Sequence, residues 1–459
     1  MFLSFFMLAI PPGWGLDEQS HVARAYQVSE GVLTPYLRDD ARTLGAQVPQ
    51  AIIDLQMDGH RASNSVDRGA PQWSRSDFDN AGDLAAMSAK PLRPEVTSDF
   101  DMSNAAASSA IAYAPAAAGI AVARALEFDT GAVLLSARFA NAIVYLGLGF
   151  LGIRLLRGFR VAWLGFVMVL FPSAIVQASY VTADTYTNAI TVLFVAAVAR
   201  LCLDRDPPAS TLLFAALAGV GVVFAKPSYA ILLAVVLAVP ATRVLPHRWR
   251  TGTVARDRRR AHATRWGYLG VASLVTALLL FTTSSVASAI SAMYGRGAEP
   301  AEQLRGVLGH PLETILVMVR SVVVSGDFWA RSLFGSIGYN GVNLPEIAAV
   351  GLVALVVVAS LNGEVLGRIR AASMVAIAVG AALVSMLALY LSFTPVGSSV
   401  VDGVQGRYFV PILFPFLLGA RSLLPMRAQM SPRASAVVYP IGAITVLGAL
   451  AVTWILALY

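Results

Sequence analysis

The chain has 459 residues, of which 57% are hydrophobic and only 13% are charged. Because an average soluble domain is about 25% charged, this chain has too little charge to cover a soluble globule. The net charge is +7, but the basic residues lie in short gaps between apolar blocks, as the positive-inside rule produces. We therefore exclude a soluble protein and a nucleic-acid-binding protein. The single cysteine, Cys202, also excludes disulfides within the chain and multi-cysteine metal sites.

The apolar blocks predict an all-α integral membrane protein with about 11 transmembrane helices, because about 20 apolar residues are needed to cross the bilayer. The first block is shorter than a full span. We therefore expect either that the natural chain starts upstream of this sequence or that the block forms a partly re-entrant helix. Residues 104–127, which Pro115 interrupts, predict a re-entrant or interfacial helix. The predicted spans are 1–12, 132–153, 161–179, 184–203, 210–225, 227–243, 266–290, 344–361, 371–393, 408–424 and 434–457.

Arginine distribution predicts the orientation of a single transmembrane domain, 1–459. Arginine clusters occupy alternate loops, including the basic loop 244–265, and this places those loops in the cytoplasm. The two large polar segments, 13–103 and 291–343, then face outward. Within the second of these, residues 310–323 have an apolar face and predict an interfacial helix.

The segment after the first apolar block carries the first candidate site. Asp17 and Glu18 are followed by His21 and Arg24, and a helix over 17–29 would place Asp17, His21 and Arg24 on one face. A carboxylate at a helix N-terminus is favoured in its ionised form and can act as a general base. The alternative is that Asp17 is only an N-cap.

Arg407 is the second candidate, because it lies on the outer side against the general arginine distribution. Its guanidinium offers forked donors that suit a phosphate, and Gln405 and Tyr408 crowd the same turn. The alternative is an interfacial arginine whose side chain reaches lipid headgroups.

Lys226 and Asp184 are the third pair of candidates, at the outer ends of predicted spans. Pro227 breaks the helix after Lys226 and holds this cation near bilayer depth, where ionisable groups are functional candidates. The alternatives are a helix-end anchor for Lys226 and a helix cap for Asp184. Arg138, within the span that starts near 132, is predicted to pair with a carboxylate such as Asp184.

Cofactor motifs are missing from the sequence, which has no phosphate-binding loop, no dinucleotide fingerprint and no zinc-ligand spacing. We therefore predict no cofactor and no metal site. The sequence leaves a divalent ion open, and only Asp17 and Glu18 with His21 are placed to bind one.

The ordered motifs resemble a bacterial family of polytopic membrane proteins long catalogued as a domain of unknown function. They are LDEQSH (16–21), TADTYTN (182–188), AKPSY (225–229), LFGSIGY (333–339) and DGVQGRYFVP (402–411). Leu16 departs from the proline that the family usually has there. The family looks like a branch of the GT-C glycosyltransferases, which have amphipathic helices and a catalytic carboxylate in a large first outer loop.

This resemblance implies an enzyme of the bacterial cytoplasmic membrane with an extracytoplasmic active site. A sugar would pass from a polyprenyl-phosphate donor to a cell-envelope glycan or glycolipid. Asp17 and Glu18 would be catalytic, Lys226 and Arg407 would bind the donor phosphate, and further substrate contacts would come from His21, Arg24, Asp184, Gln405 and Tyr408.

Two other functions remain open on the sequence. A lipid-linked saccharide transporter would also have many spans and cations at membrane level, but it would more often place charges along an internal path and show repeat symmetry. A non-catalytic subunit of envelope assembly would keep the fold without needing Asp17 for activity.

Overall fold

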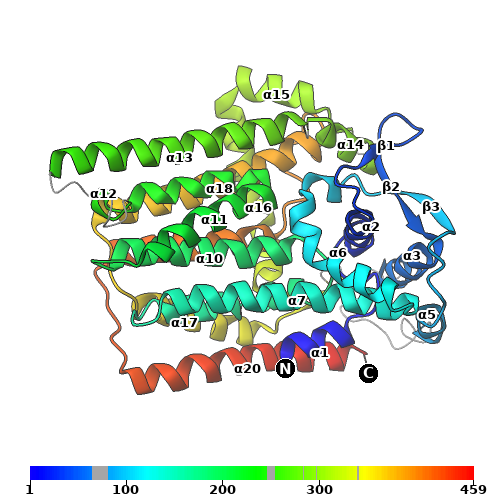
Figure 1. Ribbon diagram of the computed structural model, residues 1–459, viewed down its shortest axis with the longest axis horizontal. Coiled ribbons are helices and arrows are strands. Elements are labelled where there is room, and N and C mark those ends of the chain that lie inside the picture. Colours follow the sequence, from blue (N-terminus) through cyan, green and yellow to red (C-terminus); the bar gives the residue numbers. More distant parts are fainter. Residues whose placement is uncertain (65–80, 245–253, 283, 296, 339–340, 459) are drawn as a thin grey trace.

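The structure is a computed structural model that describes residues 1–64, 81–244, 254–282, 284–295, 297–338 and 341–458. Long helices lie side by side along one direction, and short helices with a small sheet cover one end of this bundle (Figure 1). The chain is therefore a mostly helical membrane protein, as the composition predicted.

Each of the predicted spans falls on helical backbone. In the described part of the chain, four helices are long and apolar enough to cross a membrane: α7 (Thr130–Leu155), α10 (Ala183–Leu203), α18 (Arg368–Ser392) and α20 (Pro432–Leu458). A fifth span results if α15 (Pro300–Gly309) and α16 (Pro311–Phe334), which meet at 109°, cross together. The full number of about 11 spans stays a prediction.

The other helical segments are shorter or less apolar. They are α1 (Phe2–Ala9), α6 (Ala110–Ala125), α8 (Ala162–Val169), α9 (Pro172–Ala178), α11 (Ala209–Ala225), the 3-10 helix η2 (Pro227–Ala238), α12 (Ala241–Val244), α13 (Val254–Thr282), α14 (Ser284–Tyr294), α17 (Glu346–Leu361), the 3-10 turn η4 (Gly406–Phe409) and α19 (Val410–Leu423). The predicted interfacial helix at 310–323 lies within α16, whose apolar side chains Leu312, Leu316, Val319 and Val323 are exposed.

Prolines and caps set several helix ends. One predicted span is divided into α8 and α9 because Pro172, at the first position of α9, has no N–H with which to continue α8. Pro227 similarly begins η2 after Lys226 at the end of α11. Thr182 caps α10 by accepting a hydrogen bond from the Asp184 N–H (3.3 Å). Asp184 and Lys226 consequently lie at helix ends and not within the apolar bodies.

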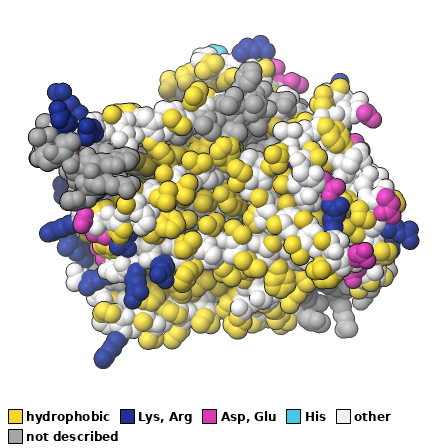
Figure 2. All heavy atoms as spheres, viewed as in Figure 1, with side chains coloured by type: hydrophobic (Ala, Val, Ile, Leu, Met, Phe, Trp, Pro, Cys, Tyr) yellow, Lys and Arg dark blue, Asp and Glu magenta, His cyan; other side chains and the backbone are white. Residues whose placement is uncertain are grey.

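Charge is distributed unevenly along the bundle. Figure 2 shows Lys and Arg side chains gathered at the end that holds α12 and the start of α20, with hydrophobic side chains over the middle. Exposed arginines at this basic end are Arg154, Arg157, Arg160, Arg427 and Arg433. We call the opposite end, which carries the first polar loop, the loop end. By the positive-inside rule the basic end would lie in the cytoplasm, and this orientation stays a prediction.

The first polar loop contains helices and, against the prediction of helices alone, a sheet. Its helices are α2 (Glu18–Ser29), α3 (Gln50–Asn64) and α5 (Ala81–Ser88), and its antiparallel strands, in the order β1-β2-β3, are β1 (Tyr36–Leu37), β2 (Leu44–Pro49) and β3 (Thr97–Asp101). β2 buries Leu44, Ala46 and Val48, and the Arg38 Nε donates to Asp99 (2.6 Å) beside it. Because the strands are short and β2 pairs with β3 across about 50 residues, their alternation was too weak to predict.

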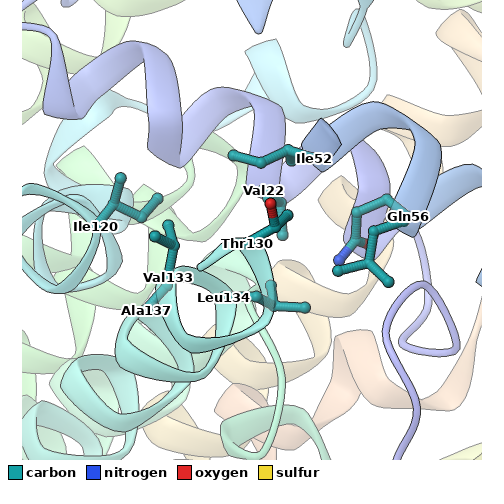
Figure 3. A pocket seen from close by; sticks show the side chains of 9 residues that line it. Val22, Ile52, Gln56, Ile120, Thr130, Val133, Leu134 and Ala137 are labelled. Carbon is teal, nitrogen blue, oxygen red and sulfur yellow. The ribbon is translucent and has the colours of Figure 1, made fainter. Parts of the chain in front are cut away.

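Apolar packing holds α2 against the bundle. A hydrophobic cluster joins α2 and α3 to α6 and the first half of α7. Figure 3 shows its centre, where Val22, Ile52, Ile120 and Val133 surround a cavity of about 10 Å³. This is about the space of one water, so the cavity is a packing gap and not a ligand site.

The two ends of the chain lie close together at one side of the bundle (Figure 1). The indole Nε1 of Trp454 in α20 donates to the carbonyl of Ala9 at the end of α1 (3.2 Å). The rings of Trp14 and Trp454 meet edge to face with centroids 6.0 Å apart. These contacts fix the end of α1, from which the segment that carries Asp17 continues.

Candidate functional site

Glu18 is fully buried and every oxygen of its carboxylate is bound. The Arg138 Nε and Nη2 donate to its two oxygens at 2.9 and 2.8 Å. The backbone N–H groups of Gly13, Gly15 and Val181 donate to the same carboxylate at 3.2, 3.4 and 3.4 Å. Glu18 therefore anchors the loop before α2, and the catalytic role predicted for it beside Asp17 stays a prediction.

Arg138 completes this anchor from α7. Its guanidinium also donates to the carbonyls of Met7 (3.0 Å), Ile10 (2.7 Å) and Pro11 (3.3 Å), where α1 ends. A cation there satisfies carbonyls that have no partner within the helix. The predicted pairing of Arg138 with Asp184 is wrong, because its donors to carboxylate are taken by Glu18. The prediction that Arg138 pairs with a carboxylate is confirmed, but the carboxylate is that of Glu18 and not that of Asp184.

Asp17 lies at the N-cap position of α2 but does not cap it. Its backbone is left-handed, with φ 59°, a conformation that is uncommon for residues other than glycine. The side chain makes no cap hydrogen bond and instead accepts from the Arg407 Nη2 at 2.9 Å. Its side chain is 27% exposed, in contrast to the buried Glu18. The alternative of a simple N-cap therefore fails, and Asp17 remains accessible.

Asp184 joins the two candidate cations. The Lys226 Nζ lies 2.6 Å from one carboxylate oxygen, and the Arg407 Nη1 lies 3.6 Å from the other. Together with the bond from Arg407 to Asp17, these contacts make an alternating row of two acids and two bases. We call Asp17, Arg407, Asp184 and Lys226 the charged row. Their formal charges cancel, so the two buried members, Arg407 and Asp184, belong to an electrically balanced cluster.

The Tyr408 ring forms one wall of the charged row. The Lys226 Nζ and the Arg407 Cζ lie 5.1 and 5.2 Å from its centroid, within the range of cation–π attraction. Its hydroxyl accepts from the Arg407 Nη2 at 3.4 Å, and its carbonyl accepts from the Tyr229 hydroxyl at 2.8 Å. The aromatic ring thus keeps both cations in place. Tyr229 was missed as a contributor, although it lies in the AKPSY motif.

Arg407 has N–H groups that make no hydrogen bond, although its side chain is only 4% exposed. Its Nε has no hydrogen-bond partner in the part of the chain that the structure describes, and neither does the Gln405 Oε1. Its Nη1 also lacks a hydrogen bond and has only the 3.6 Å ion pair with Asp184. A buried guanidinium N–H without a partner costs free energy. The arrangement therefore favours an oxyanion that would take up these donors, and it argues against the alternative of an arginine that reaches lipid headgroups.

Gly406 positions Arg407 by close backbone contact with α16. Its N–H donates to the Ser332 hydroxyl at 2.7 Å. A Cβ at this position would lie 1.9 Å from the Trp329 carbonyl oxygen and 2.3 Å from the Leu333 nitrogen. Both are backbone atoms, so no side-chain movement would relieve the overlap. The glycine in QGRY is thus explained by packing.

We expect Gly406→Ala to displace η4 from α16 and to destabilise the protein by roughly 1–3 kcal/mol or more, since overpacking forces backbone shifts. Thermal unfolding of the purified variant in detergent measures this. Gly351→Ala in α17 is the matched control, because its added methyl group meets open space and helical alanine is preferred over glycine. Equal unfolding temperatures for the two variants would contradict the packing role of Gly406.

His21 lies beside the charged row but is neutral. Burial lowers its pKa from 6.5 to about 4, and the nearby carboxylates of Asp17 and Asp184 offset this only in part. The His21 Nδ1 lies 2.8 Å from the Tyr113 hydroxyl, which donates its single proton to the Ala105 carbonyl (3.0 Å). Nδ1 must then carry the proton, which leaves Nε2 as an acceptor. Tyr113, which no sequence motif indicated, therefore orients His21.

Arg24 is directed away from the charged row. Its guanidinium donates to the Gln27 side chain and to the carbonyls of Val32 and Leu33, so it fastens the end of α2 to the next turn. The structure therefore does not bring Arg24 together with Asp17 as the helical spacing predicted. Because Asp17 is outside the helix, its side chain leaves the face that Arg24 occupies.

No group of three or more His, Cys, Asp or Glu side chains in the described ranges is arranged to hold a metal ion. Of the three residues that the sequence offered for one, Glu18 is bound by Arg138 and three backbone N–H groups. Asp17 is engaged by Arg407. The charged row is thus arranged as a set of ion pairs in which Arg407 contacts both Asp17 and Asp184.

Residues 1–415 match a family described as "Predicted membrane protein (DUF2142)", and this match includes all four members of the charged row. The chain belongs to this family. No curated protein and no solved structure matches it. The family match supports a membrane protein with several apolar helices, and what the charged row does is open to proposal.

Proposed function

We propose that the protein is a GT-C-type glycosyltransferase of the bacterial cytoplasmic membrane, which transfers a sugar from a polyprenyl-phosphate donor to a cell-envelope glycan or glycolipid. One observation carries this proposal: an accessible carboxylate, Asp17, lies 2.9 Å from a buried arginine whose Nε and Nη1 have no hydrogen-bond partner among the described residues. A base and an anion-binding group side by side suit transfer from a phosphate leaving group.

The proposed reaction assigns each group one task. Arg407 and Lys226 hold the donor phosphate, and Asp17 accepts the proton of the acceptor hydroxyl. A bond forms between the acceptor oxygen and the anomeric carbon while the bond from that carbon to the phosphate oxygen breaks. The leaving polyprenyl phosphate carries the released electron pair, and the two cations stabilise its charge.

The resting ion pairs support an ordered sequence of binding. Asp17 is bound to Arg407 in the free protein, so its carboxylate is engaged before any substrate binds. A donor phosphate on Arg407 would compete for this guanidinium and release Asp17. The acceptor hydroxyl would then meet a released Asp17 carboxylate only once the donor is bound.

The position of the charged row supports an extracytoplasmic site. Asp17 belongs to the first polar loop at the loop end, away from the exposed arginines of the basic end. The positive-inside rule places the basic end in the cytoplasm. Lipid-linked donors are the activated sugars that suit a site on the other side, where nucleotide sugars are absent.

The test is sugar transfer by purified protein in detergent, from synthetic polyprenyl-phosphate sugars and the corresponding nucleotide sugars to envelope acceptors. We expect transfer from the lipid donors alone. Lys226→Gln is expected to raise the donor concentration for half-maximal rate by at least about 10-fold, because it removes a charged contact to the phosphate. Arg157→Gln, which removes an exposed charge at the basic end, should leave this concentration unchanged.

Absence of transfer from every donor would contradict the proposal. Movement of lipid-linked sugar across vesicles that contain the protein, without transfer, would identify a transporter. Neither activity, together with loss of envelope glycan on deletion of the gene, would identify an assembly subunit.

A further inference from the structure

A basic site lies at the opposite end of the bundle from the charged row. A cleft of about 480 Å³ opens there between the loop before α8, the end of α10, the loop from α17 to α18 and the end of α19. This volume is within the roughly 300–1,000 Å³ typical of small-molecule sites. Arg160, Arg421 and Arg427 line it, with Glu364 as the single acidic residue.

The acidic residue does not neutralise the arginines. The Glu364 carboxylate accepts from the backbone N–H groups of Arg160 (2.6 Å) and Val161 (2.9 Å) at the start of α8. Glu364 therefore caps a helix N-terminus. Neither Arg160 nor Arg427 forms an ion pair with any carboxylate of the described chain. The cleft thus keeps a net charge of +2, from three guanidinium groups and one carboxylate.

Arg421 supplies the observation that points to a ligand. It is 4% exposed, and its Nη1 donates to the Met426 carbonyl at 2.8 Å. Its Nε is buried and has no hydrogen-bond partner within the described ranges. As a buried donor without a partner is costly, a bound anion in the cleft would satisfy it.

The surroundings of the cleft indicate where this anion comes from. Leu423, Leu424 and Met426 next to Arg421 are exposed by 45%, 51% and 62%. Exposed apolar side chains beside basic groups at the end of a helical bundle are typical of the level at which lipid headgroups meet the acyl chains. Basic pockets between helices on the cytoplasmic side suit anionic headgroups.

We propose that this cleft binds the phosphate of an anionic phospholipid from the cytoplasmic leaflet. Arg421 donates to the phosphate from the inner wall, and Arg160 and Arg427 contact it from the rim. The site is separate from the charged row, because Arg407 lies in η4 just before α19 and Arg421 lies near the far end of α19, roughly 20 Å away at 1.5 Å per residue. A lipid here would join the loops that end α7, α10, α17 and α19.

The proposal is tested by native mass spectrometry of the full chain in detergent. Phosphatidylglycerol or phosphatidylcholine is added, and the amount of bound lipid is measured. We expect preferential binding of phosphatidylglycerol. The double variant Arg160→Gln/Arg427→Gln, which spares the buried Arg421, should weaken it by about 10- to 30-fold. Arg154→Gln/Arg157→Gln is the matched control, since it removes two exposed charges from the same end outside the cleft, and we expect it to bind as wild type does.

Inorganic phosphate and glycerol 3-phosphate are added as competitors to distinguish the sources of the phosphate. Displacement of the lipid only by excess phosphatidylglycerol supports the membrane lipid as ligand. Displacement by inorganic phosphate at similar concentrations would show that the cleft binds a soluble phosphate and not a membrane lipid. Equal binding of both lipids by wild type, or an equal loss in both double variants, would overturn the proposal.

Discussion

Asp17→Asn is expected to lower the rate of sugar transfer by about 10²- to 10⁴-fold, the usual contribution of a general base. Asparagine has nearly the same shape as aspartate but cannot take the acceptor proton. Because the Asp17 side chain is 27% exposed and the buried Arg407 keeps Asp184 as a second carboxylate partner, its replacement should leave the unfolding temperature close to that of wild type. Single-turnover transfer from a polyprenyl-phosphate sugar measures the rate, and thermal unfolding checks the fold.

The same variant separates a base from a donor-binding residue. If Asp17 holds Arg407 in the free protein, asparagine gives up this ion pair and leaves the guanidinium readier for phosphate. The donor should then bind as tightly as to wild type, or more tightly, while the rate falls. Asp39→Asn removes an exposed carboxylate from the same loop and should change neither quantity. Transfer at the wild-type rate by Asp17→Asn would remove Asp17 from the mechanism.

The sequence allowed the helices to be located, but not the contacts that each element makes with distant elements. Apolar length located the helices, including all four that are long and apolar enough to span in the described chain. Periodicity did not reveal the sheet, since β1 has two residues and β2 pairs with a strand about 50 residues away. Short strands depend on such distant partners, and a single sequence does not contain the pairing.

The candidate site shows the same limit at the level of single residues. Asp17 and Glu18 are adjacent and chemically alike, and the sequence predicted a shared catalytic role for them. The left-handed backbone at Asp17 turns the two side chains apart, so that one meets Arg407 and the other Arg138. These partners are 390 and 120 residues away. The motifs identified the right residue types for the site. Which acid pairs with which base could be seen only in the three-dimensional structure.

The ion pair between Glu18 and Arg138 leads to the second large effect. Glu18→Gln is expected to destabilise the protein by about 3–5 kcal/mol, because it leaves the guanidinium of Arg138 buried and uncompensated. Thermal unfolding in detergent, with the yield of folded protein, measures this. Glu95→Gln, at an exposed position in the same loop, should stay within about 0.5 kcal/mol of wild type.

We therefore expect the two neighbouring carboxylates to have different roles, Glu18 in stability and Asp17 in the reaction. Glu18→Gln is expected to lose fold and activity together, whereas Asp17→Asn loses activity alone. Replacing both partners, in Glu18→Leu/Arg138→Met, removes the uncompensated charge and should recover part of the stability lost by Glu18→Gln. If Glu18→Gln instead unfolds as wild type does but no longer transfers sugar, Glu18 acts in the reaction and the anchor role assigned to it is wrong.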